Sequence, residues 1–380
     1  MQNNKNPQNS QDIKIISRTS QTNSISDTRA HTPQRVFYPD FLRVIAIFAV
    51  IVLHVASSQW GISSDTYEWQ IFNLYNGLVR WCVPVFVMVS GMFLLDFRRY
   101  SESVSENLAR ILKKNIFRMI IVLIFWSIIY AFSFDISKFA LNFFASVFRP
   151  SCYHLWFLYL IIGLYILAPF LQVLVRNLSK KDFEILLIVL IIFGPCFEFL
   201  NVFMRYFLDK EIYFPMPEFN GYILYFLAGF YFANFKISNA TKKQIYIFAI
   251  IFLVVSIALN STFAINDELS RYGTQYFYSN KIVKLNTALV TFAIFIYAKD
   301  FFGKYQFSDK FYKFTTKLSA LSFGIYLIHP AILSILHKFH ITSTTLNPII
   351  MIPLLSLAVF VISALLAFIL SKIPILRKVV

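Results

Sequence analysis

A series of long apolar segments, separated by short polar loops, constrains the fold of this chain most strongly. Most segments approach the roughly 20 residues that an α-helix needs to cross a bilayer. Only 14% of the 380 residues are charged, whereas soluble domains contain about 25%. We therefore predict an all-α integral membrane protein, a bundle of about ten transmembrane helices. The segments lie near residues 37–57, 76–96, 116–134, 154–174, 183–203, 220–235, 243–262, 282–299, 318–337 and 349–370.

Lysine and arginine are distributed unevenly among the loops. The loops after the second, fourth, sixth and eighth segments are rich in these residues, as is the C-terminal end, and the intervening loops are poorer. Cytoplasmic loops carry such an excess, so we predict that both termini are cytoplasmic and that the protein is a multi-pass protein of the cell (plasma or inner) membrane. The net charge of +16 indicates anionic membrane lipids as partners. No segment resembles a nucleic-acid-binding module, so nucleic acid is not an expected partner.

The N-terminal stretch differs in composition from the rest of the chain. Residues 1–34 are rich in Asn, Gln, Ser and Thr, and such a composition cannot bury a core. We predict a disordered polar cytoplasmic tail over 1–34, no cleavable signal peptide, and one transmembrane domain over 35–380.

The first apolar segment contains two ionisable side chains. Arg43 and His54 are eleven positions apart, which in a helix is three turns plus about 20°, so they share one face about 16 Å apart along the axis. A snorkelling arginine and a packing histidine would be a structural interpretation. Because ionisable groups are costly in hydrocarbon, and a buried histidine can act as a base near neutral pH, we favour a functional pair. Asp40, one turn before Arg43, is expected to form an ordinary (i, i+3) ion pair.

Other ionisable groups fall at similar depths in the predicted topology. Arg80 lies in the outer part of the second segment, His154 and Trp156 begin the fourth, and His329 lies deep in the ninth before Pro330. These side chains could converge in the outer half of the bundle. The structural alternatives are an aromatic belt for His154 and Trp156 and a packing histidine beside a proline kink for His329.

Two further patterns have both a structural and a functional interpretation. Lys114 and Arg118 are spaced i, i+4 at the cytoplasmic start of the third segment, where they would anchor the helix or bind phosphate. Ser90-Gly91 and Ala228-Gly229 favour close helix packing over a serine nucleophile.

Several classes of active site have no support in the sequence. Cys82, Cys152 and Cys196 lack metal or redox spacing, and no Walker loop, dinucleotide turn or zinc motif is present. We therefore expect no metal ion and no ATP-driven pump.

Four segments together resemble the membrane-bound acyltransferase family 3, whose members O-acylate surface sugars and other exported molecules. The resemblance covers about residues 36–370, and only the first segment is individually specific. The third segment looks closest to the members that O-acetylate enterobacterial common antigen. The four are Asp40-Phe41-Leu42-Arg43 through His54, residues 83–91, Tyr153-His154-Leu155-Trp156-Phe157-Leu158 with Tyr165 and Pro169, and residues 322–330 ending in His329-Pro330.

The resemblance implies an acyl donor, usually acetyl-CoA, that enters from the cytoplasm, and a carbohydrate or lipid-linked glycan as the acceptor. The 16 Å between Arg43 and His54 is comparable to the reach of the coenzyme A arm. His54 would be the base, with an acyl-histidine intermediate as an alternative. The expected sites are catalytic His54, Arg43 and His329, donor-binding Arg43, Lys114 and Arg118, and acceptor-binding Arg80, His154 and Trp156.

The sequence is also compatible with other functions. A glycan or lipid-linked sugar exporter would also place buried charges in a bundle of helices, although it needs no coenzyme A site. An enzyme with a lipid, peptide or secondary-metabolite acceptor is a second alternative, and a receptor or scaffold has little support. The acyl group and the oligomeric state, a homo-oligomer included, are not determined by the sequence.

Overall fold

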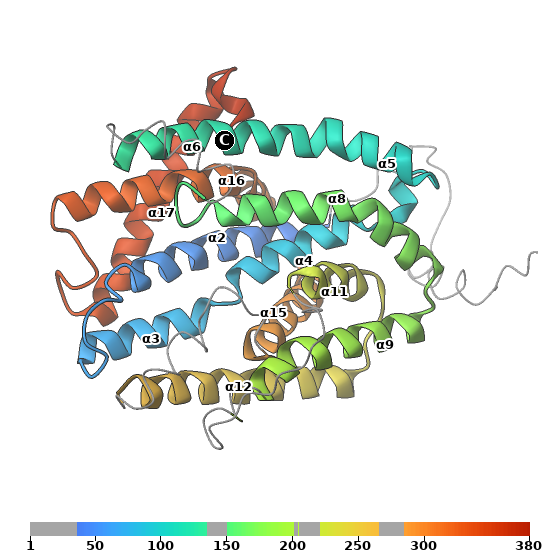
Figure 1. Cartoon of the computed structure of the whole chain (residues 1–380), viewed down its shortest axis with the longest axis horizontal. Helices are drawn as coiled ribbons and strands as arrows, with labels where there is room; N and C mark the ends of the chain where they lie inside the picture. The colour runs from blue at the N-terminus through green and yellow to red at the C-terminus, as the bar shows by residue number, and fades with distance from the viewer. Residues whose placement is uncertain (1–35, 135–149, 201–203, 205–220, 266–284) are drawn as a thin grey trace, which may run out of the picture.

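The computed structural model describes residues 36–134, 150–200, 204, 221–265 and 285–380 (Figure 1). The predicted tail at 1–34 and the segment ends at 201–203, 220 and 282–284 lie outside these residues. Within the described ranges every regular element is a helix and no strand occurs.

Nine described helical stretches are long and apolar enough to cross a membrane, and a tenth is shorter. This result confirms the predicted all-α membrane bundle. Tyr67–Leu94 contains two helices, α3 and α4, whereas Val104–Phe132 and Lys180–Leu200 each contain a π turn, at Leu112–Ile116 and Ile192–Cys196. The helices are α2 Tyr38–Ser57, α3 Tyr67–Val79, α4 Cys82–Leu94, α5 Val104–Ile111, α6 Phe117–Phe134, α8 Trp156–Asn177, α9 Lys180–Ile191, α11 Ile223–Asn234, α12 Asn239–Ile265, α15 Leu285–Lys304, α16 Asp309–Lys338 and α17 Pro348–Lys372.

The helices form a layered bundle in which the N-terminal helices are central. In Figure 1, α5 and α6 lie along one edge, α12 lies along the opposite edge, and α2, α4 and α8 lie between them. Helix α2 packs against α3, α4, α16 and α17. The segment that carries Arg43 and His54 is therefore surrounded by other helices of the bundle.

The second predicted segment is interrupted at Arg80. The sequence predicted one continuous span over 76–96, but the helix begins at Tyr67, ends at Val79 and resumes at Cys82. Pro84 explains the break, because it has no N–H to donate to the carbonyl of Arg80 four residues earlier. Arg80 therefore lies at the junction of α3 and α4 and not inside a helix.

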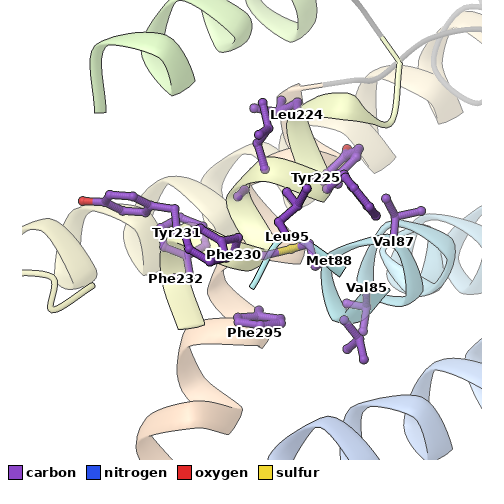
Figure 2. Close-up of a cluster of buried hydrophobic side chains, with 14 of the residues drawn as sticks. Val85, Val87, Met88, Leu95, Leu224, Tyr225, Phe230, Tyr231, Phe232 and Phe295 are labelled. Atoms are coloured by element: carbon purple, nitrogen blue, oxygen red, sulfur yellow. The ribbon is translucent and has the colours of Figure 1, made fainter. Parts of the chain in front are cut away.

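Two glycines allow α4 and α11 to cross in close contact. A Cβ atom added at Gly91 would lie 1.9 Å from the carbonyl oxygen of Phe226, and one added at Gly229 would lie 2.0 Å from that of Met88. Figure 2 shows Met88 of α4 beside the aromatic side chains of α11, with Phe295 of α15 nearby. The close packing that the small residues predicted is confirmed.

Helix α11 is short but extends between the two ends of the bundle. Its 12 residues span about 18 Å. Tyr222, just before it, packs on Trp156 at the start of α8, and Phe235, just after it, packs on Phe183 at the start of α9. The Lys299 ammonium group donates to the carbonyls of Phe232 and Ala233 at 2.6 and 3.0 Å, so these carbonyls at the end of α11 are paired within the bundle.

Candidate active site

The centre of the candidate site is a contact between two histidines from distant parts of the chain. Nδ1 of His54 on α2 lies 2.7 Å from Nε2 of His329 on α16. The two rings are almost coplanar, with an interplanar angle of 5°. The similar depth predicted for these histidines therefore corresponds to a direct hydrogen bond.

The surroundings of His329 determine which nitrogen carries each proton. Nδ1 of His329 lies 3.2 Å from the carbonyl oxygen of Ile325, and the backbone carbonyl of Tyr326 is also within interaction range of the ring. Pro330 has no N–H to pair with that Tyr326 carbonyl. Carbonyl oxygens only accept hydrogen bonds, so Nδ1 of His329 is the protonated nitrogen and Nε2 of the neutral ring is an acceptor.

The same logic extends to His54. Because Nε2 of His329 accepts, Nδ1 of His54 must donate the 2.7 Å hydrogen bond. In neutral His54 the lone pair then lies on Nε2, on the opposite side of the ring. This arrangement orients a basic nitrogen in the way that a histidine base requires.

His54 also differs from the neighbouring histidines in accessibility. His329 and His154 are buried, with 0% and 1% of their surface exposed, whereas His54 retains part of its surface. The edge of the His54 ring contacts the exposed side chain of Tyr153, with 4.8 Å between centroids. A reacting molecule can therefore approach His54 more readily than the other two.

His154 is buried behind the pair, whereas an aromatic belt would leave its ring at the surface of the bundle. Its ring contacts the rings of Tyr130, Tyr326 and His329 at 5.1, 5.2 and 5.7 Å between centroids. Neither ring nitrogen has a hydrogen-bond partner. Acceptor contact by His154 remains a prediction.

Arg80 connects the histidine pair to the predicted acceptor residues. Its Nε donates to Oδ1 of Asn76 at 2.6 Å, and its charge is within electrostatic range of His54 and Tyr222. Tyr222 packs against Trp156 with 5.7 Å between ring centroids. Arg80 and Trp156 therefore belong to one cluster beside His54. Asn76 and Tyr222 were missed by the sequence analysis, although the i, i+4 spacing of Asn76 and Arg80 was a detectable signal.

A cavity of about 280 Å³ lies between the predicted cytoplasmic end of the bundle and the histidine pair. Arg43 and Arg118 line one part of it. Val50 and Tyr326 also line it, and these residues lie about one turn before His54 and His329 respectively. Arg43 and Val50 continue toward His54 along one face of α2, as the eleven-residue spacing predicted.

Arg43 is held at this cavity by an ion pair and an aromatic ring. Its guanidinium lies 3.5 Å from the Asp40 carboxylate and 5.5 Å from the centroid of Phe93. Asp40 is 3% exposed and accepts a 2.8 Å hydrogen bond from Ser319 of α16. The predicted (i, i+3) pair is confirmed, and it also connects α2 to α16.

The structure separates the two basic residues at the start of the third segment. Arg118 lines the cavity, and its Nη2 donates to the carbonyl oxygen of Val380 at 3.2 Å. Val380 lines the cavity too, and Trp126 fixes the preceding carbonyl of Val379 at 2.9 Å. Lys114 is exposed, within the π turn, and is not among the residues that line the cavity. Only Arg118 of this pair is therefore positioned beside Arg43.

The cysteine next to the histidine cluster is not suited to nucleophilic attack. Cys152 precedes α8 and is buried. Burial raises the pKa of its thiol to about 11, so the thiol stays protonated near neutral pH. This leaves the imidazole of His54 as the better base or nucleophile in the cluster.

The chain is similar to a known protein family along most of its length. A family model described as an acyltransferase domain matches residues 36–371, which include every helix named above except the last residue of α17. No curated protein and no solved structure matches the chain. The match covers the residues of all four segments on which the resemblance rested. The chain therefore belongs to acyltransferase family 3 and is a membrane acyltransferase.

Proposed function

We propose that this protein is an O-acyltransferase that moves an acetyl or other short acyl group from cytoplasmic acyl-CoA to a hydroxyl of a surface or lipid-linked carbohydrate. One observation carries the proposal. The cavity begins at two arginines and ends about one turn from a histidine whose basic nitrogen is oriented by a second histidine. Such a cavity suits a donor that is anionic at one end and reactive at the other.

The donor would enter from the predicted cytoplasmic end. Arg43 and Arg118 would bind phosphate oxygens of coenzyme A by charge-assisted hydrogen bonds. The arm would follow the face of α2 past Val50 toward His54. Lys114, outside the cavity, would contact only the part of the donor that remains at the surface.

The reaction would use His54 as a general base. Nε2 of His54 takes the proton of the acceptor hydroxyl, whose oxygen attacks the thioester carbonyl. The carbon–sulfur bond breaks, and coenzyme A leaves with the proton that His54 returns to its sulfur. His329 supports the charged ring by accepting from Nδ1, and Arg80 stabilises the negative charge that develops on the carbonyl oxygen. In the alternative, Nε2 attacks the thioester first and an acyl-histidine carries the acyl group.

The acceptor would be bound from the opposite side, where Arg80, Tyr222 and Trp156 form one cluster. Aromatic rings beside a guanidinium group suit a sugar. The rings cover the apolar face of the sugar, and the guanidinium group donates hydrogen bonds to its oxygens. We expect the protein to act in the cell inner membrane, surrounded by lipids.

Donor turnover tests the proposal. The full chain is purified in nanodiscs and supplied with acetyl-CoA that is radiolabelled in the acetyl group, and coenzyme A release, protein labelling and label in added glycan are measured. We expect saturable coenzyme A release. Labelled protein would indicate the acyl-histidine route, and direct transfer to glycan the general-base route. Folded protein that binds no acetyl-CoA and releases none would overturn the proposal in favour of an exporter.

A further inference from the structure

A row of polar side chains extends along one face of α3 toward His54. Gln70, Asn73, Asn76 and Arg80 follow one another at intervals of three, three and four residues, which places them on one side of a helix. Asn73 and Asn76 are each 1% exposed. Buried amides inside a membrane bundle are costly unless they bind a partner.

The hydrogen bonds of Asn73 and Asn260 have a single consistent direction. Nδ2 of Asn73 donates to the carbonyl oxygen of Ile257 on α12 at 3.2 Å, so its Oδ1 faces the other way. Nδ2 of Asn260 donates to that Oδ1 at 2.6 Å. Because a carbonyl only accepts, neither amide can be flipped without losing these bonds. Oδ1 of Asn260 is consequently a free acceptor, and it has no partner.

Asn76 is oriented by the same kind of constraint. Nε–H of Arg80 can only donate, and it donates to Oδ1 of Asn76 at 2.6 Å. Nδ2 of Asn76 is therefore a free donor, also without a partner. One free donor and one free acceptor remain on two residues that Asn73 links, since Asn260 bonds Asn73, which lies one turn before Asn76 on α3.

Helix association alone does not explain these two atoms. The bonds that hold α3 to α12 are already made by Asn73, and the Ser261 hydroxyl donates to the Gln70 side chain at the half-buried end of the row. An unpaired amide group in a buried position costs about 1–3 kcal/mol. Asn76 and Asn260 each leave one such amide atom unpaired, and Asn260 is 0% exposed.

We propose that Asn76 and Asn260 bind a hydroxyl group of the carbohydrate acceptor. A hydroxyl donates one hydrogen bond and accepts another, which matches the free acceptor of Asn260 and the free donor of Asn76. The site lies between the half-buried Gln70–Ser261 end and Arg80, which is within electrostatic range of His54. A second hydroxyl of the same molecule would then reach His54. This inference rests on the proposed acyl transfer and adds the residues that select a polyhydroxylated acceptor.

Acceptor kinetics with a simple glycoside test the inference. The full chain in nanodiscs receives radiolabelled acetyl-CoA and increasing hexyl β-D-glucopyranoside, and labelled glucoside is measured. Asn76→Asp keeps the acceptor for Arg80 and removes the free donor, and Asn260→Leu removes the free acceptor. We expect each to raise the KM for glucoside by about fivefold or more, with the KM for acetyl-CoA within twofold of wild type.

Asn286→Leu is the matched control. Asn286 is buried on α15 and donates to Ser256 of the same α12 helix at 2.9 Å, so its loss also weakens packing around α12. We expect it to change the KM for glucoside less than twofold. An equal rise in all three variants would overturn the inference, because it would indicate helix packing alone.

A binding measurement separates this inference from the acyl-transfer proposal. Without acetyl-CoA, the glucoside should raise the Tm of the wild type and of Asn286→Leu, and raise it less in Asn76→Asp and Asn260→Leu. If the wild type releases no coenzyme A but the glucoside still gives the selective Tm shift, acyl transfer is rejected and the hydroxyl site is retained. A wild type that releases coenzyme A but neither acylates nor binds the glucoside would reject the site, and a buried water would then pair the two amides.

Discussion

The hydrogen bond between Nδ1 of His54 and Nε2 of His329 spans 2.7 Å and joins two residues that are 275 positions apart in the sequence. Because His329 is itself fixed by backbone carbonyls of α16, the bond leaves Nε2 of His54 as the basic atom. His329 acts through His54 in this account and is a positioning residue with no access of its own to a substrate.

Replacing His329 tests that role. His329→Leu removes the acceptor for Nδ1 of His54, and we expect kcat to fall by about 10²-fold or more with little change in the KM for acetyl-CoA. His329→Gln can still offer a carbonyl oxygen and should recover part of kcat. Steady-state kinetics decide the outcome, and equal loss in the two variants, or a loss confined to KM, would contradict the positioning role.

Pro330 gives a prediction in which stability and activity change in opposite directions. Pro330→Ala supplies an N–H for the Tyr326 carbonyl, which then competes with Nδ1 of His329 for it. We expect a higher Tm, because a proline inside a helix costs about 3 kcal/mol, together with slower acyl transfer. Thermal unfolding in nanodiscs and turnover on the same preparation measure both, and a variant that gains both stability and rate would show that the freed carbonyl does not matter.

The crossing of α4 and α11 predicts which glycine cannot be replaced. Gly229→Ala would place Cβ 2.0 Å from a backbone carbonyl of Met88, so the helices must separate and the Tm should fall sharply. Gly163→Ala is the control, because a Cβ there meets nothing within 4 Å and alanine should stabilise α8 by up to about 1 kcal/mol. Similar unfolding temperatures for the two variants would contradict the close crossing.

The two basic residues at the predicted cytoplasmic end, Lys114 and Arg118, are predicted to differ in donor binding. Arg118 lines the cavity and Lys114 does not. Arg118→Ala should raise the KM for acetyl-CoA by about tenfold, the loss expected for a charge-assisted hydrogen bond. Lys114→Ala should raise it less than threefold. Titration of acetyl-CoA against each variant is the measurement, and the reverse order would mean that the donor approaches by another route.

Much of the fold could be predicted from the sequence, because apolar length and the distribution of charge report directly on the membrane. The eleven-residue spacing also placed Arg43 and His54 correctly on one face of α2. The break at Arg80 was not predicted, although the effect of Pro84 on the preceding turn is a local rule. The long apolar segment favoured one continuous helix, although Pro84 lies within it.

The candidate site was only partly predictable, because contacts between helices depend on packing that spacing does not encode. Nothing in the sequence pairs Asn73 with Asn260 or places Val380 beside Arg118. His154 was assigned to an aromatic belt because it adjoins Trp156, yet its ring is buried against Tyr130, Tyr326 and His329. The similar depth of His54 and His329 could be predicted from the sequence. Their hydrogen bond could not, because it depends on how α2 packs against α16.

Loss of acyl transfer on replacing His54 tests the central claim most directly. Coenzyme A release from acetyl-CoA is measured for wild type, His54→Ala and the control His337→Ala, a histidine at the far end of α16, each shown to be folded in nanodiscs. The account predicts that His54→Ala is slower by about 10²–10⁴-fold and that His337→Ala is close to wild type. A well-folded His54→Ala that releases coenzyme A at nearly the normal rate would contradict the assignment of His54 as the base.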